Sequence, residues 1–438
     1  MKNTKYLAIL SVFLLCLLHS GPASAKVYID IDSPAFQKLP IAIADFKPLR
    51  PFVGKSDLPV WFADTLSRDL LLTGYFNVID RRAFLEDPGQ AGITEEGTRF
   101  GDWSTIGAEY LVKGGYQMDD RELVMELRLF DVTKGALLVG KRYSGRPDDR
   151  GRIIRQFANE ILVALTGEAG VFDTRIAFIK KGTSATELYT INFDGSDLRR
   201  ITHHNSLTLS PRWSPDGRRL AYTSFKDGNP DIYLQELDSG KTEKIVSYPG
   251  LNLPGSWSRD GAMLLVTLSR EGSPGIYDMN VGSRILQRLT RESTINVSPV
   301  RSPDEKRIAF VSNRNGSPQI YVMDADGGNV RRLTMEGNYN TSPAWSPKAK
   351  KIAYEGSVNG QFQIFVIDEE GGAPRQMTFD RGDHESPSWS PDGRYLVHSV
   401  RGGGRNRIAI MNAGGGSSIV LQEGGDSFQS PFWSPRLR

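Results

Sequence analysis

The sequence predicts two domains, an N-terminal α/β domain followed by a six-bladed β-propeller that is closed by the C-terminal strand. Three observations support this fold class. A tryptophan recurs at a step of 44 residues in the second part of the chain, columns of apolar residues keep the same step, and residues 26–167 lack this repeat. Four-stranded units of about 40–45 residues are typical of propeller blades. The tryptophans are Trp213, Trp257, Trp345, Trp389 and Trp433.

Six repeat units follow one another without an insertion. Arg301 occupies the one vacant position of the tryptophan series, and Lys348-Ala349 stands where other units have Asp-Gly. In the unit that begins at Pro343, the pattern predicts strands over 343–346, 351–354, 363–367 and 375–378. Pro-Asp-Gly turns at 215–217 and 391–393 separate the first and second strands, because proline presets φ and glycine takes a positive φ. An apolar column supports this register: Ile176, Leu220, Leu264, Ile308, Ile352 and Leu396.

The ends of the repeat predict how the ring closes. The first unit, from Arg175, has second, third and fourth strands but no preceding Trp-Ser-Pro strand. Such a strand occurs at Pro431-Phe-Trp-Ser-Pro435, after the last complete unit. We therefore expect the C-terminal strand to complete the first blade, which removes open sheet edges. Loss of the last dozen residues should then unfold the ring.

Residues 26–167 mix strand and helix patterns, which predicts an α/β domain, and the propeller is expected over 168–438. Helical periodicity runs over 58–72 and over 153–165, where Gly167 is a natural C-cap. Between and around these helices, alternating or continuous apolar runs indicate strands. The expected strands cover 26–30, 41–44, 74–79, 109–113, 122–129 and 136–139.

The first 25 residues have the pattern of a secretory signal peptide. Lys2 and Lys5 precede an apolar run over 7–18, and small residues at 23–25 predict cleavage after Ala25. The alternative, an uncleaved anchor, is disfavoured because the run is shorter than the ~20 residues of a membrane span. The single cysteine, Cys16, lies inside this run after Leu15, where a lipidation signal has a small residue. The expected mature chain is periplasmic and has no cysteine, so it has no disulfide and no thiol chemistry.

Charge argues against nucleic acid as a partner. The formal net charge is +3, and no block of lysine and arginine forms a phosphate-tracking stripe. No motif for a cofactor stands out, and none is expected.

Several segments together resemble the TolB family of the periplasmic Tol–Pal cell-envelope system. Residues 166–178 (TGEAGVFDTRIAF), 66–70 (LSRDL) and 107–112 (GAEYLV) carry the resemblance, together with the tandem Trp-Ser-Pro-Asp-Gly repeats. The Trp-Ser-Pro-Asp-Gly string occurs in other propellers, so the first three segments and their order make the match specific. The resemblance covers essentially the whole chain, and Arg301 and Lys348-Ala349 are local departures from it.

The resemblance implies a non-enzymatic adaptor that supports outer-membrane integrity and envelope constriction at cell division. Its propeller would bind the peptidoglycan-associated lipoprotein Pal, and its mature N-terminus would bind TolA of the inner membrane. Other outer-membrane or peptidoglycan-associated proteins are further partners that it allows. The segment expected to engage TolA is Lys26, Val27, Tyr28, Ile29, Asp30, Ile31, Asp32 and Ser33. If this strand and the propeller are coupled across the domains, deleting it should change the affinity for Pal.

The candidate partner-binding residues lie just before or at the start of each first strand, where a propeller chain enters the mouth of the central channel. A ring of amides and imidazoles would offer donors and acceptors to a partner without burying charge. The alternative is that the asparagines cap their own turns. By resemblance, 251–254 and 296–297 match the Pal-contacting region, although their side chains differ. The set is His204, Asn205, Leu251, Asn252, Pro254, Asn296, Val297, Asn340, Thr341, His384, Glu385 and Gln429.

Enzymatic alternatives find little support in the sequence. A prolyl-oligopeptidase-like hydrolase needs a Gly-x-Ser-x-Gly elbow, and no such string occurs. A metal-dependent lactonase-like propeller needs convergent carboxylates in its channel, which are scarce at these positions. His203 and His204 resemble a metal pair, but neighbouring residues of a strand point to opposite faces. Neither a catalytic nor a metal site is therefore expected.

Overall fold

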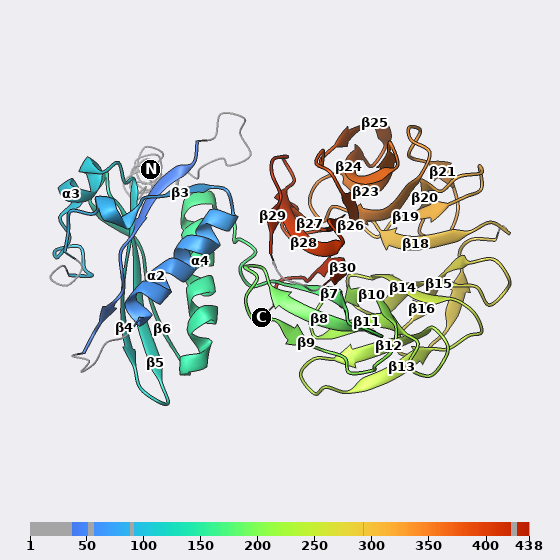
Figure 1. Ribbon diagram of the computed structural model, residues 1–438, viewed down its shortest axis with the longest axis horizontal. Coiled ribbons are helices and arrows are strands. Elements are labelled where there is room, and N and C mark those ends of the chain that lie inside the picture. The colour runs from blue at the N-terminus through green and yellow to red at the C-terminus, as the bar shows by residue number, and fades with distance from the viewer. Residues whose placement is uncertain (1–36, 51–56, 88–91, 292, 422–426, 438) are drawn as a thin grey trace, which may run out of the picture.

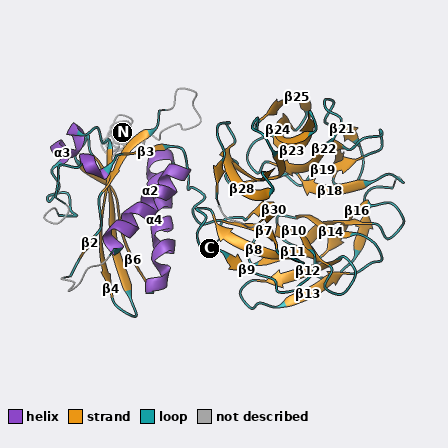
Figure 2. Ribbon diagram, viewed as in Figure 1, coloured by secondary structure: helices purple, strands orange, loops and turns teal. Residues whose placement is uncertain are grey.

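The computed structural model describes residues 37–50, 57–87, 92–291, 293–421 and 427–437. The predicted signal peptide and the segment from Lys26 to Ser33 lie outside these residues. Two bodies lie side by side, an N-terminal α/β domain and a ring of strands (Figure 1). The α-helices of the described chain all belong to the first body, and the second consists of strands and their connections (Figure 2).

The N-terminal domain is built on one mixed sheet of strand order β3-β1-β4-β5-β6, with β2 paired to β4. Strand β1 runs parallel to both β3 and β4, while β4, β5 and β6 form an antiparallel meander. The meander was predicted, and the structure confirms it. The strands are β1 (Leu39–Ile43), β2 (Lys47–Pro48), β3 (Phe76–Val78), β4 (Tyr110–Met118), β5 (Leu123–Asp131) and β6 (Ala136–Gly145).

Two long helices cover one face of this sheet (Figure 1). Helix α2 (Leu58–Leu72) has the predicted bounds, and α4 (Arg150–Thr166) extends the predicted 153–165 by three residues and one residue. Gly167 caps α4 at φ 79°, a conformation that costs glycine little. Three short helical elements were not predicted, and one of them inserts the buried Trp103. They are η1 (Arg81–Ala83), α3 (Phe100–Thr105) and η2 (Pro147–Asp149).

Six four-stranded antiparallel sheets form the propeller, as predicted. In order around the ring, the inner strands are β30 (Ser427–Trp433), β10 (Thr208–Trp213), β14 (Asn252–Trp257), β18 (Asn296–Arg301), β22 (Asn340–Trp345) and β26 (Asp383–Trp389). The second strands are β7 (Arg175–Lys181), β11 (Arg219–Ser224), β15 (Met263–Leu268), β19 (Arg307–Ser312), β23 (Lys351–Val358) and β27 (Tyr395–Gly402). The third strands are β8 (Thr186–Asn192), β12 (Asp231–Glu236), β16 (Gly275–Asn280), β20 (Gln319–Asp324), β24 (Gln361–Asp368) and β28 (Arg405–Asn412). The outer strands are β9 (Arg199–Arg200), β13 (Thr242–Val246), β17 (Leu286–Arg288), β21 (Arg331–Arg332), β25 (Gly371–Gln376) and β29 (Ile419–Val420).

The ring closes as the sequence predicts, because β30 pairs with β7 in one sheet. Trp433 lies opposite Ile176, which is the register that each tryptophan of the series keeps with its apolar partner in the other blades. The backbone N–H of Arg175 also donates to the Ser434 hydroxyl at 2.9 Å. The first blade is therefore joined from two segments that lie far apart in the sequence.

The end of the propeller where each inner strand turns into the second strand is called the turn end below. In four blades a serine hydroxyl donates to an aspartate two residues later, at 2.5–2.6 Å. The fifth blade has Lys348-Ala349 instead, and there the Ser346 hydroxyl accepts from the backbone N–H of Ala349 at 3.1 Å. The serine therefore keeps the turn without its aspartate. The four pairs are Ser214–Asp216, Ser258–Asp260, Ser302–Asp304 and Ser390–Asp392.

Arg301, which stands where the other blades have tryptophan, is matched by a second change in the repeat. Its guanidinium pairs with the Asp278 carboxylate at 2.6 Å, and both side chains are largely buried. The positions equivalent to Asp278 in the other blades hold Thr190, Leu234, Val322, Val366 and Ile410. In this blade an ion pair thus replaces an indole packed on an uncharged residue. Each charge reduces the free-energy cost of burying the other.

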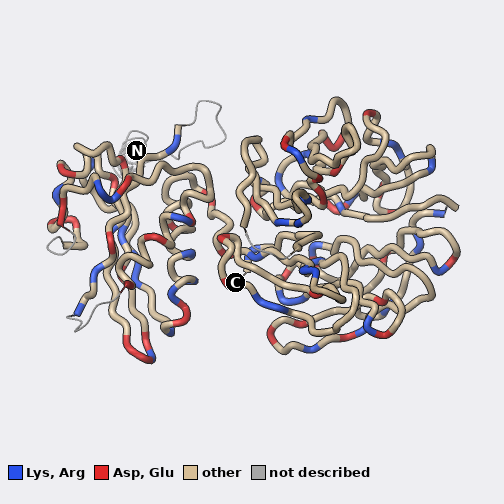
Figure 3. The backbone as a smooth tube through the Cα atoms, viewed as in Figure 1, with Lys and Arg blue, Asp and Glu red and all other residues tan. Residues whose placement is uncertain are grey.

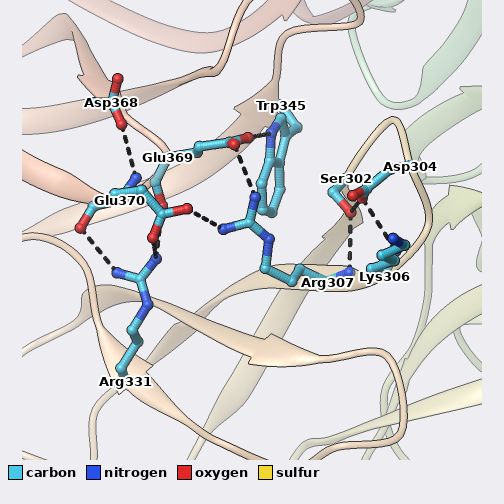
Figure 4. A network of polar contacts seen from close by, with 9 residues as sticks. All are labelled: Ser302, Asp304, Lys306, Arg307, Arg331, Trp345, Asp368, Glu369 and Glu370. Carbon is cyan, nitrogen blue, oxygen red and sulfur yellow. Dashed lines mark hydrogen bonds and ion pairs between the residues drawn. The ribbon is translucent and has the colours of Figure 1, made fainter.

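Neighbouring blades are also joined by polar contacts between side chains. Arg307 of β19 contacts Glu369 at 2.9 Å and Glu370 at 2.6 Å, both just after β24 of the next blade (Figure 4). Arg331 of β21 reaches Glu370 at 2.9 Å. Glu369 in turn accepts from the Trp345 indole N–H at 3.1 Å, so the tryptophan is held by the same network.

The N-terminal domain packs against the turn end. The Tyr395 hydroxyl at the start of β27 donates to the Thr73 carbonyl at 2.9 Å, and its ring lies near Tyr75. One apolar core joins both domains and includes Phe193 and Trp433 of the propeller. At its edge, Arg68 of α2 pairs with Asp194 at 3.2 Å. The opposite end of the propeller carries none of these contacts to the described part of the N-terminal domain.

Candidate protein-binding surface at the propeller mouth

The opposite end, called the mouth end, is where the six inner strands begin. Successive residues of a strand point to opposite sides, so a shift of one position exchanges buried and exposed side chains. One position near the start of each inner strand is buried in all six blades, where its side chain is 0–3% exposed. That position holds Thr208, Asn252, Asn296, Asn340, His384 and Phe428.

The three asparagines therefore do not present their amides to a partner. Asn252 donates to the Tyr248 carbonyl at 2.7 Å and accepts from the Tyr248 N–H at 3.2 Å. Asn296 donates to the Thr294 carbonyl at 2.9 Å, and Asn340 donates to the Glu336 carbonyl at 2.8 Å. The expected ring of free amides is thus wrong, and the alternative, in which each asparagine caps its own turn, is what the structure contains. A buried amide bonded to its own loop fixes the loop shape.

The residues on either side of the buried position are the exposed ones, and in four successive blades they are mainly apolar. Leu207, Ile295 and Tyr339 precede the buried position and are 41%, 45% and 42% exposed. The residues that follow it are partly exposed. The alternation of side chains along a strand is the signal in the sequence that could have identified these apolar residues, because they flank the asparagines on both sides. We call the following set the mouth crescent: Leu207, Leu209, Leu251, Leu253, Ile295, Val297, Tyr339 and Thr341.

The sixth blade, which begins with β26, changes the character of this surface. Asp383 and Glu385 occupy the two flanking positions there, and Arg401 of β27 pairs with both carboxylates at 2.7 Å and 3.2 Å. Burial raises the pKa of Glu385, an effect that the Arg401 charge opposes. The first blade has Ser427 and Gln429 of β30 at the same positions. The mouth crescent therefore covers four blades of the mouth end, and the other two blades carry polar groups at the same positions.

Glu355 of β23 lies beneath the acidic part of the mouth. Its carboxylate accepts from the backbone N–H of Ser386 at 2.6 Å and is 9% exposed. Burial raises its pKa to about 7, and the nearby charge of Glu385 acts in the same direction. The carboxyl is therefore a proton-binding group at neutral pH.

The two histidines of the predicted site differ in their exposure. His204 is partly buried, its Nδ1 lies 3.0 Å from the Ser224 hydroxyl, and burial lowers its pKa. His384 is 1% exposed, and its ring lies 5.1 Å from that of His398. Burial lowers the pKa of both imidazoles. The buried ring of His384 is not positioned as a surface donor, which corrects that part of the prediction, whereas the role of His204 in binding a partner stays a prediction.

The remaining predicted positions divide between surface and interior. Asn205 is exposed and takes a left-handed φ of 52°, whereas Pro254 is buried in β14. Leu251, Val297, Thr341, Glu385 and Gln429 are partly exposed. Across the described residues, no cluster of three or more histidine, cysteine, aspartate or glutamate side chains is arranged to hold a metal ion. None of the described helices combines the length and apolarity that a membrane crossing requires.

Taken together, the fold and this surface define a two-domain propeller protein: an α/β domain covers one end of the propeller, and the other end is partly apolar and is not covered by the described part of that domain. Two family models match the chain, one described as the TolB amino-terminal domain over residues 27–138 and one as the TolB beta propeller domain over residues 163–437. The chain belongs to the TolB family. This family is a non-enzymatic component of the Tol-Pal system.

Individual relatives agree with the family assignment. The Tol-Pal system protein TolB of Syntrophus aciditrophicus is 54% identical over 47% of this chain and 46% of the relative. That of Desulfosudis oleivorans is 43% identical over 50% and 51%. In these matches the chain spans about half the length of the curated relatives. The crystal structure of TolB from Acinetobacter baumannii superposes with a TM-score of 0.80 at 30% identity, covering 91% of this chain and 97% of that one.

Proposed function

We propose that this protein is a periplasmic adaptor of the Tol-Pal system that binds the lipoprotein Pal at the mouth end of its propeller. The observation that carries the proposal is the mouth crescent, an exposed apolar surface on four successive blades at the end that the N-terminal domain leaves open. Protein interfaces are distinguished by aromatic and apolar anchors at their centre with a polar rim. Tyr339 supplies such an anchor, and Asp383 and Glu385 supply part of the rim.

Charge supports a protein partner rather than a nucleic acid. Lysine and arginine alternate with aspartate and glutamate over both domains, and no large region has a single sign (Figure 3). A phosphate backbone would need a basic stripe. The buried asparagines contribute to the proposed site indirectly, because they fix the loops that carry the crescent.

The test is a titration of the mature protein with the soluble domain of Pal. In the I295A/Y339A variant we expect the affinity to fall by about tenfold to a hundredfold, since central aromatic anchors account for about 2 kcal/mol or more. The matched control is I285A/I419A, which removes two exposed apolar side chains outside the crescent. Failure of the parent protein to bind Pal, or equal losses in both variants, would contradict the proposal. Excess EDTA should leave the binding unchanged.

The proposed contact with TolA involves the segment from Lys26 to Ser33, which lies outside the described residues. Its support is the family resemblance. Deletion of this segment should abolish binding of TolA in a pull-down with purified proteins. The same deletion should also change the dissociation constant for Pal if the two sites are coupled. Retained TolA binding would place that contact elsewhere on the chain.

A further inference from the structure

The central channel contains a cavity that begins just below the mouth crescent and extends to the turn end. Its volume is about 440 Å³, and its walls are the later residues of all six inner strands with the turns that follow them. Among the described residues that line it, two are charged, Arg212 and Arg259, and none is acidic. A volume of this size lies within the range of small-molecule sites.

A ring of five serines lines the same cavity in a strained conformation. Each inner strand carries an irregularity in its pairing with the second strand, and in five blades a serine there has a φ between 51° and 55°. Only glycine takes this region readily, and such outliers cluster at binding sites. The sixth position of the ring is Pro254. The five residues are Ser210, Ser298, Ser342, Ser386 and Ser430.

The ring offers hydrogen-bonding groups that the protein itself does not use. Within the described part of the chain, no side-chain hydrogen bond involves the hydroxyls of Ser210, Ser298, Ser386 or Ser430, whereas the Ser342 hydroxyl interacts with Glu355. Other serines of the cavity are occupied: the hydroxyls of Ser256 and Ser388 accept backbone N–H groups of the next blade at 2.7 Å and 3.0 Å. Free hydroxyls that line a cavity suit a hydroxylated ligand.

Arg212 supplies a charge in this cavity without a counter-charge. Its guanidinium lies over the Phe432 ring at 4.7 Å, and its Nη1 donates to the Pro211 carbonyl at 2.8 Å. None of the carboxylates in the described residues pairs with it. Burial lowers its pKa to about 10, so the group is still a cation at neutral pH. A partly buried cation without a partner is costly, and an anion would relieve that cost.

We propose that this cavity binds a small hydroxylated molecule that carries an oxyanion, with the oxyanion on Arg212 and the hydroxyls on the serine ring. Carboxylate and phosphate share the chemistry that a guanidinium recognises, and both bond it at two points. Sugar acids and sugar phosphates are the ligand class of matching size and polarity. None of the mouth-crescent residues lines this cavity, so the fate of this proposal does not depend on the binding of Pal.

The competing explanation is structural. Arg212 of β10 stacks on Phe432 of β30, so the residue could serve only to join the first two blades. That role predicts a loss of stability in Arg212 variants and no saturable binding of any small anion. The two explanations therefore differ in a direct binding measurement.

The test is calorimetric titration of the mature protein with D-gluconate and with glucose 6-phosphate, with sorbitol as the neutral probe. At least one anion should bind saturably in the micromolar to millimolar range, at least tenfold tighter than sorbitol. The tighter of the two identifies the head group. Binding should be lost in R212M and retained in R218M, which removes an exposed arginine outside the cavity.

A second variant protects the test against a folding defect in R212M. S298A/S430A removes two ring hydroxyls and leaves Arg212 in place, so it should weaken binding of the anion about fivefold to tenfold. Absence of saturable binding by both anions to the parent protein would overturn the proposal. Unchanged affinity in a folded R212M variant would overturn it as well.

Discussion

The two ends of the propeller use the same backbone for different purposes. At the turn end, the same side chains recur from blade to blade: a serine that closes the turn, an aspartate two residues later, and a tryptophan packed on an apolar partner. At the mouth end, the backbone register recurs but the exposed side chains change from leucine to tyrosine to aspartate. The difference teaches that the repeated turn residues and tryptophans maintain the ring, while variation among the exposed residues of the mouth end marks the surface proposed for protein contact.

The two ends also differ in how they hold carboxylates. The hydrogen bond from the Ser258 hydroxyl lowers the pKa of Asp260, and a backbone N–H that also donates to this carboxylate lowers it further. The Ser302 hydroxyl and a backbone N–H lower the pKa of Asp304 in the same way. At the mouth end, burial raises the pKa of Glu355 and of Glu385. The aspartates therefore stabilise the fold above their unfolded pKa and lose this effect in acid. The two glutamates contribute to the stability of the fold when they are protonated, and this contribution is lost as the pH rises.

The largest effect is expected at the turn end, in strand β30, which closes the first blade. Trp433→Ala removes a 3% exposed indole whose N–H donates to the Thr174 hydroxyl at 2.8 Å. A cavity and a lost hydrogen bond together should lower the free energy of unfolding by about 5 kcal/mol. Phe379→Ala, at a 76% exposed position near the mouth, should change it by less than about 0.5 kcal/mol. Urea unfolding measures both, and similar losses would refute the contrast.

A smaller loss is expected where the turn end departs from its own repeat. Asp278→Ala leaves Arg301 buried without its carboxylate, which should cost about 3–4 kcal/mol. The double variant D278V/R301W restores the residue types of the other blades and should recover most of this loss. Thermal and urea unfolding of the three proteins test the pair. A neutral D278A variant would show that the ion pair does not compensate for the missing tryptophan.

The third effect concerns the mouth end and depends on pH. The pKa of Glu355 is raised in the fold from 4.5 to about 7, so the folded protein binds the proton more tightly than the unfolded chain. Stability should therefore fall as the pH rises from about 4.5 to about 7, by about 2–3 kcal/mol from this group. Glu355→Gln should remove that part of the slope and be the more stable protein at pH 8. Parallel pH profiles of parent and variant would exclude Glu355 as the cause.

Much of the fold was predictable because the repeat has a fixed step. Trp433 opposite Ile176 and the bounds of α2 follow from spacing and periodicity. The short helix that carries Trp103 was not predicted, because a segment of six residues has too little periodicity to be recognised. The pairing of Arg301 with Asp278 was accessible in principle, since both residues interrupt columns of other types.

The sequence pattern placed candidate residues at the ends of the inner strands, and the structure shows that the three asparagines among them lie on the buried side of these strands. A step of 44 residues places Asn252, Asn296 and Asn340 at equivalent positions, yet the step alone does not say which side of the strand faces outward. That depends on the first hydrogen-bonded pair of each hairpin and on the irregularity two residues later. These are tertiary features of the sheet, and they decided that the asparagines are buried and their neighbours exposed.

The pairing of β30 with β7 has a consequence for the order in which the propeller folds as the chain is synthesised. Strand β7 emerges long before β30, so its edge has to wait for a partner more than two hundred residues downstream. Contacts at such a separation are slow to form, and an incomplete sheet exposes an edge. A chain cut short before β30 would leave the first blade without its inner strand and would be open to proteases. The first blade, and with it the closed ring, can therefore form only after β30 has been synthesised.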